Sequence, residues 1–142
     1  MAKNKLIIDY EYDFDLYGII STAKAYKLAW LINRQLNLHL VKEEDISFSF
    51  LNEEKLVISN YLFQTEHSNF RLLKNRSEEN TPDKLGYLLP ELNKFDYFIM
   101  KKGIINDYND SELLNQLQTI EEIQYIVSLD IDKIKSRENL IF

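Results

Sequence analysis

The sequence predicts an α+β fold, with an antiparallel or mixed sheet that carries two helices on one face. Two observations lead to this class. A strand–helix–strand pattern occurs near the start of the chain and again in its last third, and a run of alternating strands lies between them. This arrangement favours a ferredoxin-like core with added strands. At 142 residues, the chain is expected to form one domain, residues 1–142.

The first unit is predicted from a change in hydrophobic period. Lys5–Tyr12 and Leu16–Ser21 contain the apolar and aromatic residues typical of strands. In Ala23–Leu36 the apolar residues recur at helical spacing, and Asn37 follows as a residue that tolerates the left-handed conformation at a helix end. Leu38–Lys42 then completes the unit as a short strand.

The middle of the chain is predicted to be an antiparallel meander. Ile46–Phe50 alternates apolar residues with serine, so one face of this strand is apolar. After a turn at residues 52–54, Lys55–Phe63 returns as the second strand, and Phe70–Lys74 is the third. Asn75–Lys84 contains no apolar residue and is therefore predicted to be a mobile loop.

The last third repeats the first pattern. Phe95–Lys101 is predicted to be a strand and Asn109–Ile120 a helix. Asn109 and Glu112 have the three-residue spacing of a capping box at the start of that helix. Ile123–Leu129 is the closing strand.

Composition narrows the classes of function. The net charge of −6 argues against nucleic-acid and anionic-membrane partners, which need a surplus of Lys and Arg. The chain contains no Cys, which excludes disulfides, thiolate catalysis and Cys-based zinc sites. Neither a signal peptide nor an apolar membrane span is recognisable. We therefore expect a cytoplasmic protein with no cofactor and no metal.

The segment Leu89–Tyr97 resembles the motif of the IPExxxVDY family, short bacterial proteins found mainly in Bacteroidetes. Four residues match the motif, whereas Leu89 replaces its Ile and Phe95 its Val. The matching residues are Pro90, Glu91, Asp96 and Tyr97. Tyr26–Asn33 is similar to the family's early helix, and Lys135–Phe142 is similar to its C-terminus. The resemblance implies a shared fold and brings no activity with it.

Two groups of carboxylates are candidates for chemistry. Glu91 and Asp96 belong to the family-like motif, but a spacing of five residues does not force two carboxyl groups to converge, so we expect them to bond backbone N–H groups. The second group recurs at every second residue along the predicted first strand and just beyond it: Asp9, Glu11, Asp13 and Asp15. This acidic comb could be a solvated strand face, a divalent-cation site or a docking site for a basic partner. A calcium-loop match fails because Lys24 stands where a bidentate Glu belongs.

Aromatic residues provide the candidate binding surfaces. Tyr26, Trp30 and Asn33 lie at helical spacing beside the apolar face of the first helix, where they could line a pocket for a flat ligand, pack in the core or form a dimer surface. The chain ends in Leu-Ile-Phe. This apolar tail, with Phe142 at its end, either docks on its own domain or inserts into a partner.

Three hypotheses of function follow. The first is a non-enzymatic interaction protein, a homodimer or an adaptor, because no catalytic motif is present: the two histidines lack metal-ligand spacing, and the three glycines are isolated. The alternative is a small-ligand-binding regulatory domain with its ligand between Ala23–Leu36 and the sheet. The third is an enzyme that uses Glu91, Asp96 or the acidic comb with a divalent cation. The ligand or partner surface is expected to include seven residues: Tyr26, Trp30, Asn33, Glu91, Asp96, Tyr97 and Phe142.

Overall fold

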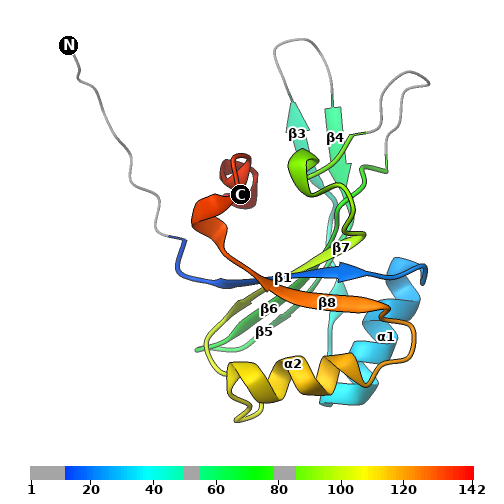
Figure 1. The fold of residues 1–142 in the computed structure, drawn as a ribbon, viewed down its shortest axis with the longest axis vertical. Coiled ribbons are helices and arrows are strands. Elements are labelled where there is room, and N and C mark those ends of the chain that lie inside the picture. Colours follow the sequence, from blue (N-terminus) through cyan, green and yellow to red (C-terminus); the bar gives the residue numbers. More distant parts are fainter. Residues whose placement is uncertain (1–11, 50–54, 79–85) are drawn as a thin grey trace, which may run out of the picture.

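The computed structural model describes residues 12–49, 55–78 and 86–142, and confirms the α+β class. A six-stranded sheet has the order β2-β5-β6-β7-β1-β8, and all its pairings are antiparallel (Figure 1). Its strands are β1 (Asp15–Ile20), β2 (Val41–Lys42), β5 (Asn60–Gln64), β6 (Asn69–Lys74), β7 (Tyr97–Lys102) and β8 (Tyr125–Leu129). A separate two-stranded sheet contains β3 (Ile46–Ser49) and β4 (Lys55–Ile58).

Four of the strands, β6-β7-β1-β8, reproduce the order of a ferredoxin-like core. In this core the segment from β1 to β6 includes helix α1 (Ala25–Leu36), and the segment from β7 to β8 includes helix α2 (Asp110–Gln118). β5 and β2 extend the sheet beyond β6. They are the added strands that the sequence pattern predicts.

Local signals explain where the helices begin and end. Asn37 ends α1 in the left-handed conformation, with φ 54°, and its backbone N–H donates to the carbonyl of Asn33. At the start of α2, the Asn109 side chain accepts from the backbone N–H of Glu112, whose side chain accepts from the backbone N–H of Asn109. The predicted capping box is therefore confirmed.

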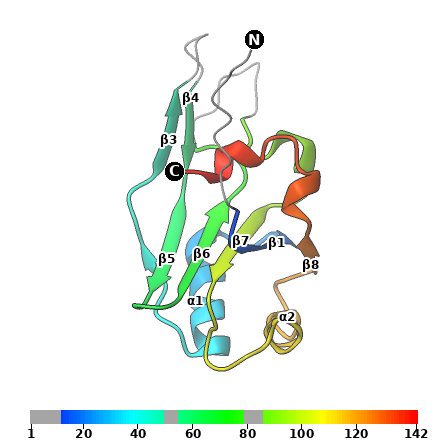
Figure 2. The same cartoon turned by 90° about the vertical axis from the view of Figure 1, so that its left-hand side faces the viewer.

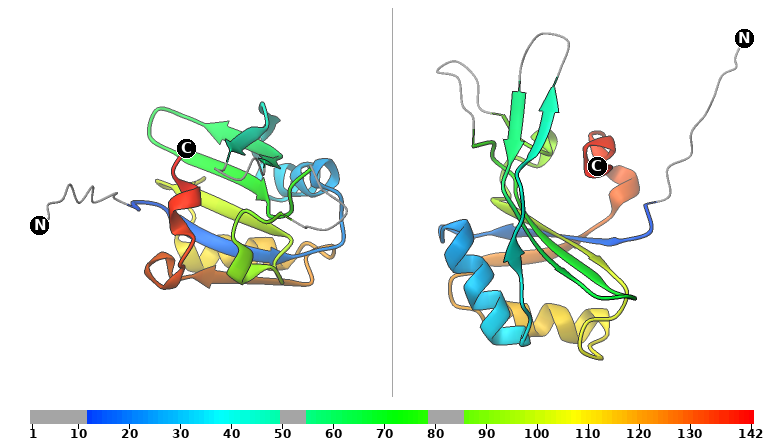
Figure 3. Two further views of the ribbon diagram at one scale, coloured as in Figure 1. Left: turned by 90° about the horizontal axis from the view of Figure 1, so that it is seen from above. Right: turned by 180° about the vertical axis from the view of Figure 1, so that it is seen from behind.

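Both faces of the sheet are covered. In Figures 1 and 2 the two helices lie on one side of it, and the view from behind in Figure 3 shows the same arrangement. One apolar core fills the space beneath α1 and α2, and alternate strand residues such as Ile19 and Leu72 contribute to it. A second core contains Leu16 and Leu73, which face the opposite way.

The second core is covered by the C-terminal segment and by the turn before β7. These segments form three short 3-10 helices: η1 (Pro90–Leu92), η2 (Ile131–Lys133) and η3 (Arg137–Leu140). Ile131, Ile134 and Leu140 bury their side chains there against Phe98 of the sheet and its neighbours. In the described part of the chain, neither helix is long and apolar enough to cross a bilayer.

One predicted strand is wrong as a single element. Lys55–Phe63 divides at Ser59 into β4 and β5, which belong to different sheets. The physical reason lies at Asn60, which is fully buried: its side-chain amide donates to the carbonyl of Glu44 and its side-chain oxygen accepts from Arg71. These bonds draw the chain towards β6, whereas β4 stays paired with β3.

The predicted mobile loop Asn75–Lys84 is also wrong at its start. Asn75 and Ser77 are buried, and Arg76 pairs with Tyr87 in an isolated bridge. Polar residues can occupy a core when each finds a hydrogen-bond partner, which the composition of this segment does not reveal. Three predicted segments lie outside the described residues: residues 79–84 of the loop, residues 5–11 of the first strand and the turn at residues 52–54.

Candidate functional site

The predicted site residues lie in three places. Asp96 and Tyr97 line a pocket at the start of α1. Tyr26 and Trp30 lie on the solvent-exposed face of α1. The remaining residues have contacts of other kinds: Asn33 bonds the loop after α1, Glu91 bonds the C-terminal segment, and Phe142 lies near β6.

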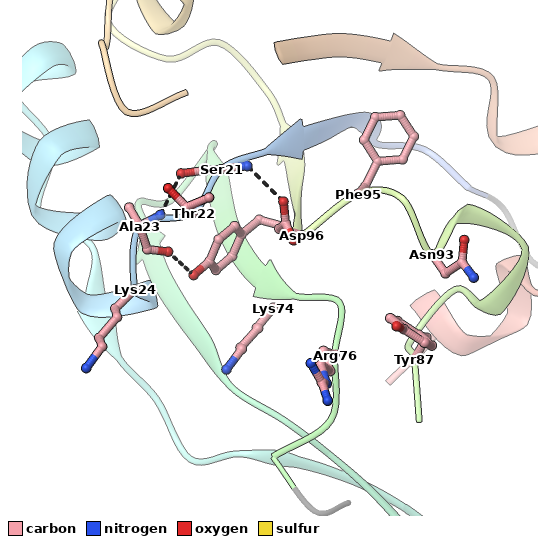
Figure 4. A pocket seen from close by; sticks show the side chains of 11 residues that line it. Ser21, Thr22, Ala23, Lys24, Lys74, Arg76, Tyr87, Asn93, Phe95 and Asp96 are labelled. Carbon is pink, nitrogen blue, oxygen red and sulfur yellow. Dashed lines mark hydrogen bonds between the residues drawn. The ribbon is translucent and has the colours of Figure 1, made fainter. Parts of the chain in front are cut away.

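The pocket has a volume of about 450 Å³. It is open to solvent and lies where the β1–α1 turn meets the ends of β6 and the turn before β7 (Figure 4). Hydroxyl, amide, cationic and aromatic side chains all contribute to its wall. The lining residues include Thr22, Lys24, Lys74, Arg76, Tyr87 and Asn93.

The motif residues position the β1–α1 turn that forms one wall of this pocket. The backbone N–H of Ser21 donates to Oδ2 of Asp96 at 2.9 Å, and the Tyr97 hydroxyl donates to the carbonyl of Ala23 at 2.6 Å (Figure 4). Burial, with added repulsion from Asp96, raises the pKa of Tyr97 to about 12. Tyr97 therefore stays a neutral hydrogen-bond donor at physiological pH.

Phe95 also lines the pocket, and its ring packs against Gly18 of β1. A Cβ atom at Gly18 would lie 2.8 Å from the Phe95 ring, closer than van der Waals contact allows. The sheet therefore accepts the ring only where the facing strand has no side chain. This contact holds the turn before β7 against the face of the sheet opposite α1.

Among the described residues, three cations line the pocket from two elements. Lys24 precedes α1, whereas Lys74 and Arg76 lie at the end of β6 and just after it. Figure 4 shows their side chains extending to the same side. Lys74 pairs with Glu78 at 3.2 Å, and no carboxylate among the described residues lies within ion-pair distance of Lys24 or Arg76.

The exposed face of α1 carries two large aromatic side chains one helical turn apart. Tyr26 is 64% exposed and Trp30 is 56% exposed. The guanidinium of Arg34 lies over the Trp30 ring, 4.7 Å from its centre. Asn33 does not join this face, because its side chain bonds the backbone N–H of Leu40 at 2.8 Å and its carbonyl at 3.3 Å.

The small-ligand hypothesis places its ligand between α1 and the sheet. Leu28, Ile32 and Leu36 fill that space, and each is almost completely buried. Packing of this kind is typical of a protein core. The pocket described above lies instead at the start of the helix, where the turn residues replace the apolar stripe.

Glu91 connects the motif to the C-terminal segment. Its carboxylate accepts from the backbone N–H of Ser136 at 2.8 Å and also from the Ser136 hydroxyl. Partial burial favours the neutral acid, but these hydrogen bonds outweigh it and hold the pKa of Glu91 below its ordinary value near 4.5. Glu91 therefore helps to hold the segment that covers the second core.

This contact predicts a pH-dependent contribution to stability. A lowered folded-state pKa stabilises the protein above pH 4.5, and the stabilisation disappears as the pH falls through the folded pKa. Because Glu91 is exposed, we expect a contribution below about 1 kcal/mol. Denaturant unfolding at neutral and acidic pH should show a larger acid loss in the wild type than in Glu91→Gln. Identical losses in the two proteins would contradict the assignment.

The apolar tail divides between the two predicted uses. Leu140 is buried in the second core, whereas Ile141 and Phe142 remain exposed. The Arg71 guanidinium lies 5.2 Å from the centre of the Phe142 ring. The tail therefore docks on its own domain through Leu140 and leaves its last two side chains accessible.

The described half of the acidic comb is paired with lysines of β7. Asp13 lies 2.8 Å from the ammonium of Lys102, and Asp15 lies 3.1 Å from that of Lys101. The hydrogen bond from Lys102 holds the pKa of Asp13 below its ordinary value. Within the described ranges, no group of three metal-ligating side chains is present. Asp9 and Glu11 lie outside those ranges.

Lys101 was not singled out in the sequence, although it forms the most buried charged contact described. Its ammonium contacts Asp15, Asp110 and the carbonyl of Gly103. The neighbouring Tyr17 is also buried, and burial together with Asp110 and Asp15 raises the pKa of its phenol. Strand alternation gave the only signal: Lys101 lies two positions from the buried Ile99 and so faces the same side of β7.

Comparison with family models gives no match to this chain, and a search of curated proteins gives no similar sequence.

Proposed function

We propose that the protein is a non-enzymatic, cytoplasmic interaction module whose α1 face binds an acidic segment of a partner protein. The observation that carries this proposal is the pair Tyr26 and Trp30, more than half exposed on one helix face. Trp and Tyr are the residues most enriched in the energetic centres of protein interfaces, and a soluble domain gains nothing from holding them in water.

Charge selects the class of partner. α1 contains no acidic residue, and its exposed face adds Lys27 and Arg34 to the two aromatic side chains. Lys27 is only loosely paired, 3.9 Å from Glu122. This face is basic although the chain has a net charge of −6. An acidic segment with apolar side chains complements both the positive charge and the aromatic surface of this face. A second copy of the acidic chain, in contrast, is repelled at long range.

The contacts of the motif carboxylates support a non-enzymatic role. Asp96 accepts from the backbone of Ser21, and Glu91 accepts from Ser136 of the segment on the second core. They therefore hold two different segments and do not converge on one reacting centre, as an acid–base pair would. From the motif resemblance, we also propose that the chain shares its fold with the IPExxxVDY family. The structural contacts of the two motif carboxylates support this proposal.

The test is selection from a random peptide display library, followed by titration of a selected peptide. We expect enrichment of Asp and Glu beside apolar residues, and affinity that falls as salt rises. Trp30→Ala should weaken binding at least about tenfold, the loss typical of an interface centre. Tyr125→Ala is the control, because Tyr125 is an exposed aromatic on β8 and belongs to the opposite face of the sheet by strand alternation.

Three results would contradict the proposal. These are selected peptides without acidic enrichment, equal losses for Trp30→Ala and Tyr125→Ala, and binding that survives the double charge reversal Lys27→Glu and Arg34→Glu. A concentration-dependent dimer that Trp30→Ala abolishes, measured by analytical ultracentrifugation, would assign this face to a second copy of the chain instead.

A further inference from the structure

We propose that the pocket at the start of α1 binds a phosphate group, either as free phosphate or as the phosphate monoester of a small molecule. The proposal goes beyond the interaction surface on α1, since it concerns the β1–α1 turn and the end of β6. It rests on the cavity, on the cations that converge there and on the neutral hydrogen-bonding groups beside them.

The charges in the pocket favour an anion. Lys24, Lys74 and Arg76 extend to the same side (Figure 4), and a doubly charged phosphate would allow all of them to contribute. Arg76 presents a planar fork of N–H donors that matches two phosphate oxygens, while the lysines act as mobile point charges. This concentration of cations stands out in a chain with a net charge of −6.

The carboxylates near these cations are already engaged. Asp96 accepts from the backbone N–H of Ser21, and Glu78 pairs with Lys74. Lys24 and Arg76 have no such partner in the described part of the chain. An incoming phosphate therefore meets two cations whose charge is not already neutralised by a described neighbour, and it can compete with Glu78 for Lys74.

Neutral groups can complete the coordination of an anion. Thr22 is exposed at the pocket wall and brings a hydroxyl, and Asn93 brings a side-chain amide from the turn before β7. Hydroxyl and amide groups donate to phosphate oxygens without adding charge. They come from segments that the Asp96 and Tyr97 bonds hold together, so the site is assembled by the folded sheet.

The size of the cavity favours a ligand larger than the anion alone. A volume of about 450 Å³ falls in the range of small-molecule sites and exceeds what one phosphate occupies. Tyr87 is half-buried at the wall and presents an aromatic surface to the remainder of such a ligand. We therefore expect a phosphate monoester to bind more tightly than free phosphate. Titration with each of the two ligands shows which one the pocket prefers.

The experiment is a titration of the full chain with inorganic phosphate and with a nucleoside monophosphate, followed by amide chemical shifts in NMR spectra. Sodium chloride at matched ionic strength is the control for non-specific screening. We expect saturable shifts at Ser21–Lys24, and a dissociation constant at least about tenfold larger in Arg76→Gln. Lys133→Gln, an exposed lysine on η2, should bind like the wild type.

A second variant tests whether the pocket prefers a negatively charged ligand. Asp96→Asn keeps the shape of the side chain and an oxygen that can accept from Ser21, but removes the one carboxylate among the described lining residues. It should tighten phosphate binding several-fold. Weaker phosphate binding in a folded Asp96→Asn protein would overturn the proposal, as would shifts that chloride reproduces or that Arg76→Gln leaves unchanged. None of these outcomes depends on Trp30, so this proposal and the proposed function fail separately.

Discussion

Asn75→Ala is expected to lower the free energy of unfolding by about 3–5 kcal/mol, because each unsatisfied buried partner of a deleted side chain costs about 1–3 kcal/mol. Asn75 is fully buried. Its side-chain amide donates to the carbonyls of Leu92 and Phe95 at 3.1 and 2.9 Å, and its side-chain oxygen accepts from the backbone N–H of Leu89 at 3.0 Å. One side chain therefore satisfies three backbone groups of the family-like segment.

Denaturant unfolding of the variant and the wild type measures this effect. Asn139→Ala is the graded control. Asn139 is partly buried, and its side-chain amide donates one hydrogen bond of 2.8 Å to the carbonyl of Leu88, so its loss should cost about 1 kcal/mol. Asn75→Asp keeps the size but loses both donors, and should resemble Asn75→Ala. A loss below about 1 kcal/mol in Asn75→Ala would mean that the turn forms without these bonds.

Lys101→Ala is expected to cost about 3 kcal/mol, near the lower end for breaking a buried ion pair. The Lys101 side chain is only 6% exposed, and its ammonium lies 3.1 Å from Asp15, 3.1 Å from Asp110 and 3.0 Å from the carbonyl of Gly103. The lower end applies because Asp15 and Asp110 are about half exposed or more, so water can rehydrate them once the lysine is gone.

Lys102→Ala is the matched control for this prediction. Lys102 is the next residue, pairs with Asp13 and is exposed, so its removal should leave the free energy of unfolding nearly unchanged. Lys101→Met keeps most of the buried stem and separates packing from charge. The prediction fails if denaturant unfolding gives Lys101→Ala and Lys102→Ala the same free energy of unfolding, because burial would then not strengthen the Lys101 ion pairs.

The elements were predictable wherever a signal is local. The capping box of Asn109 and Glu112 and the left-handed Asn37 are confirmed because each depends on residues within one turn of its helix. The division at Ser59 was not predictable, since it depends on Asn60 bonding Glu44 and Arg71, far away in the chain. The burial of Asn75 was not predictable for the same reason, since its partners are Leu89, Leu92 and Phe95.

The candidate site shows the same distinction. Tyr26 and Trp30 could be placed on one helix face from their spacing alone. Lys74 and Arg76 could not be connected with Lys24, because only the pairing of β6 with β7 and of β7 with β1 brings the end of β6 to the start of α1. These three cations therefore form one site only after the sheet has assembled.

The sequence by itself determined the α+β class and the two helices. Period and capping are properties of neighbouring residues, so they are readable without the fold. Only the tertiary structure decided which polar groups are buried, that Leu140 covers the second core and where the pocket lies. Those outcomes depend on contacts between residues far apart in the chain, and such contacts exist only after the sheet has assembled.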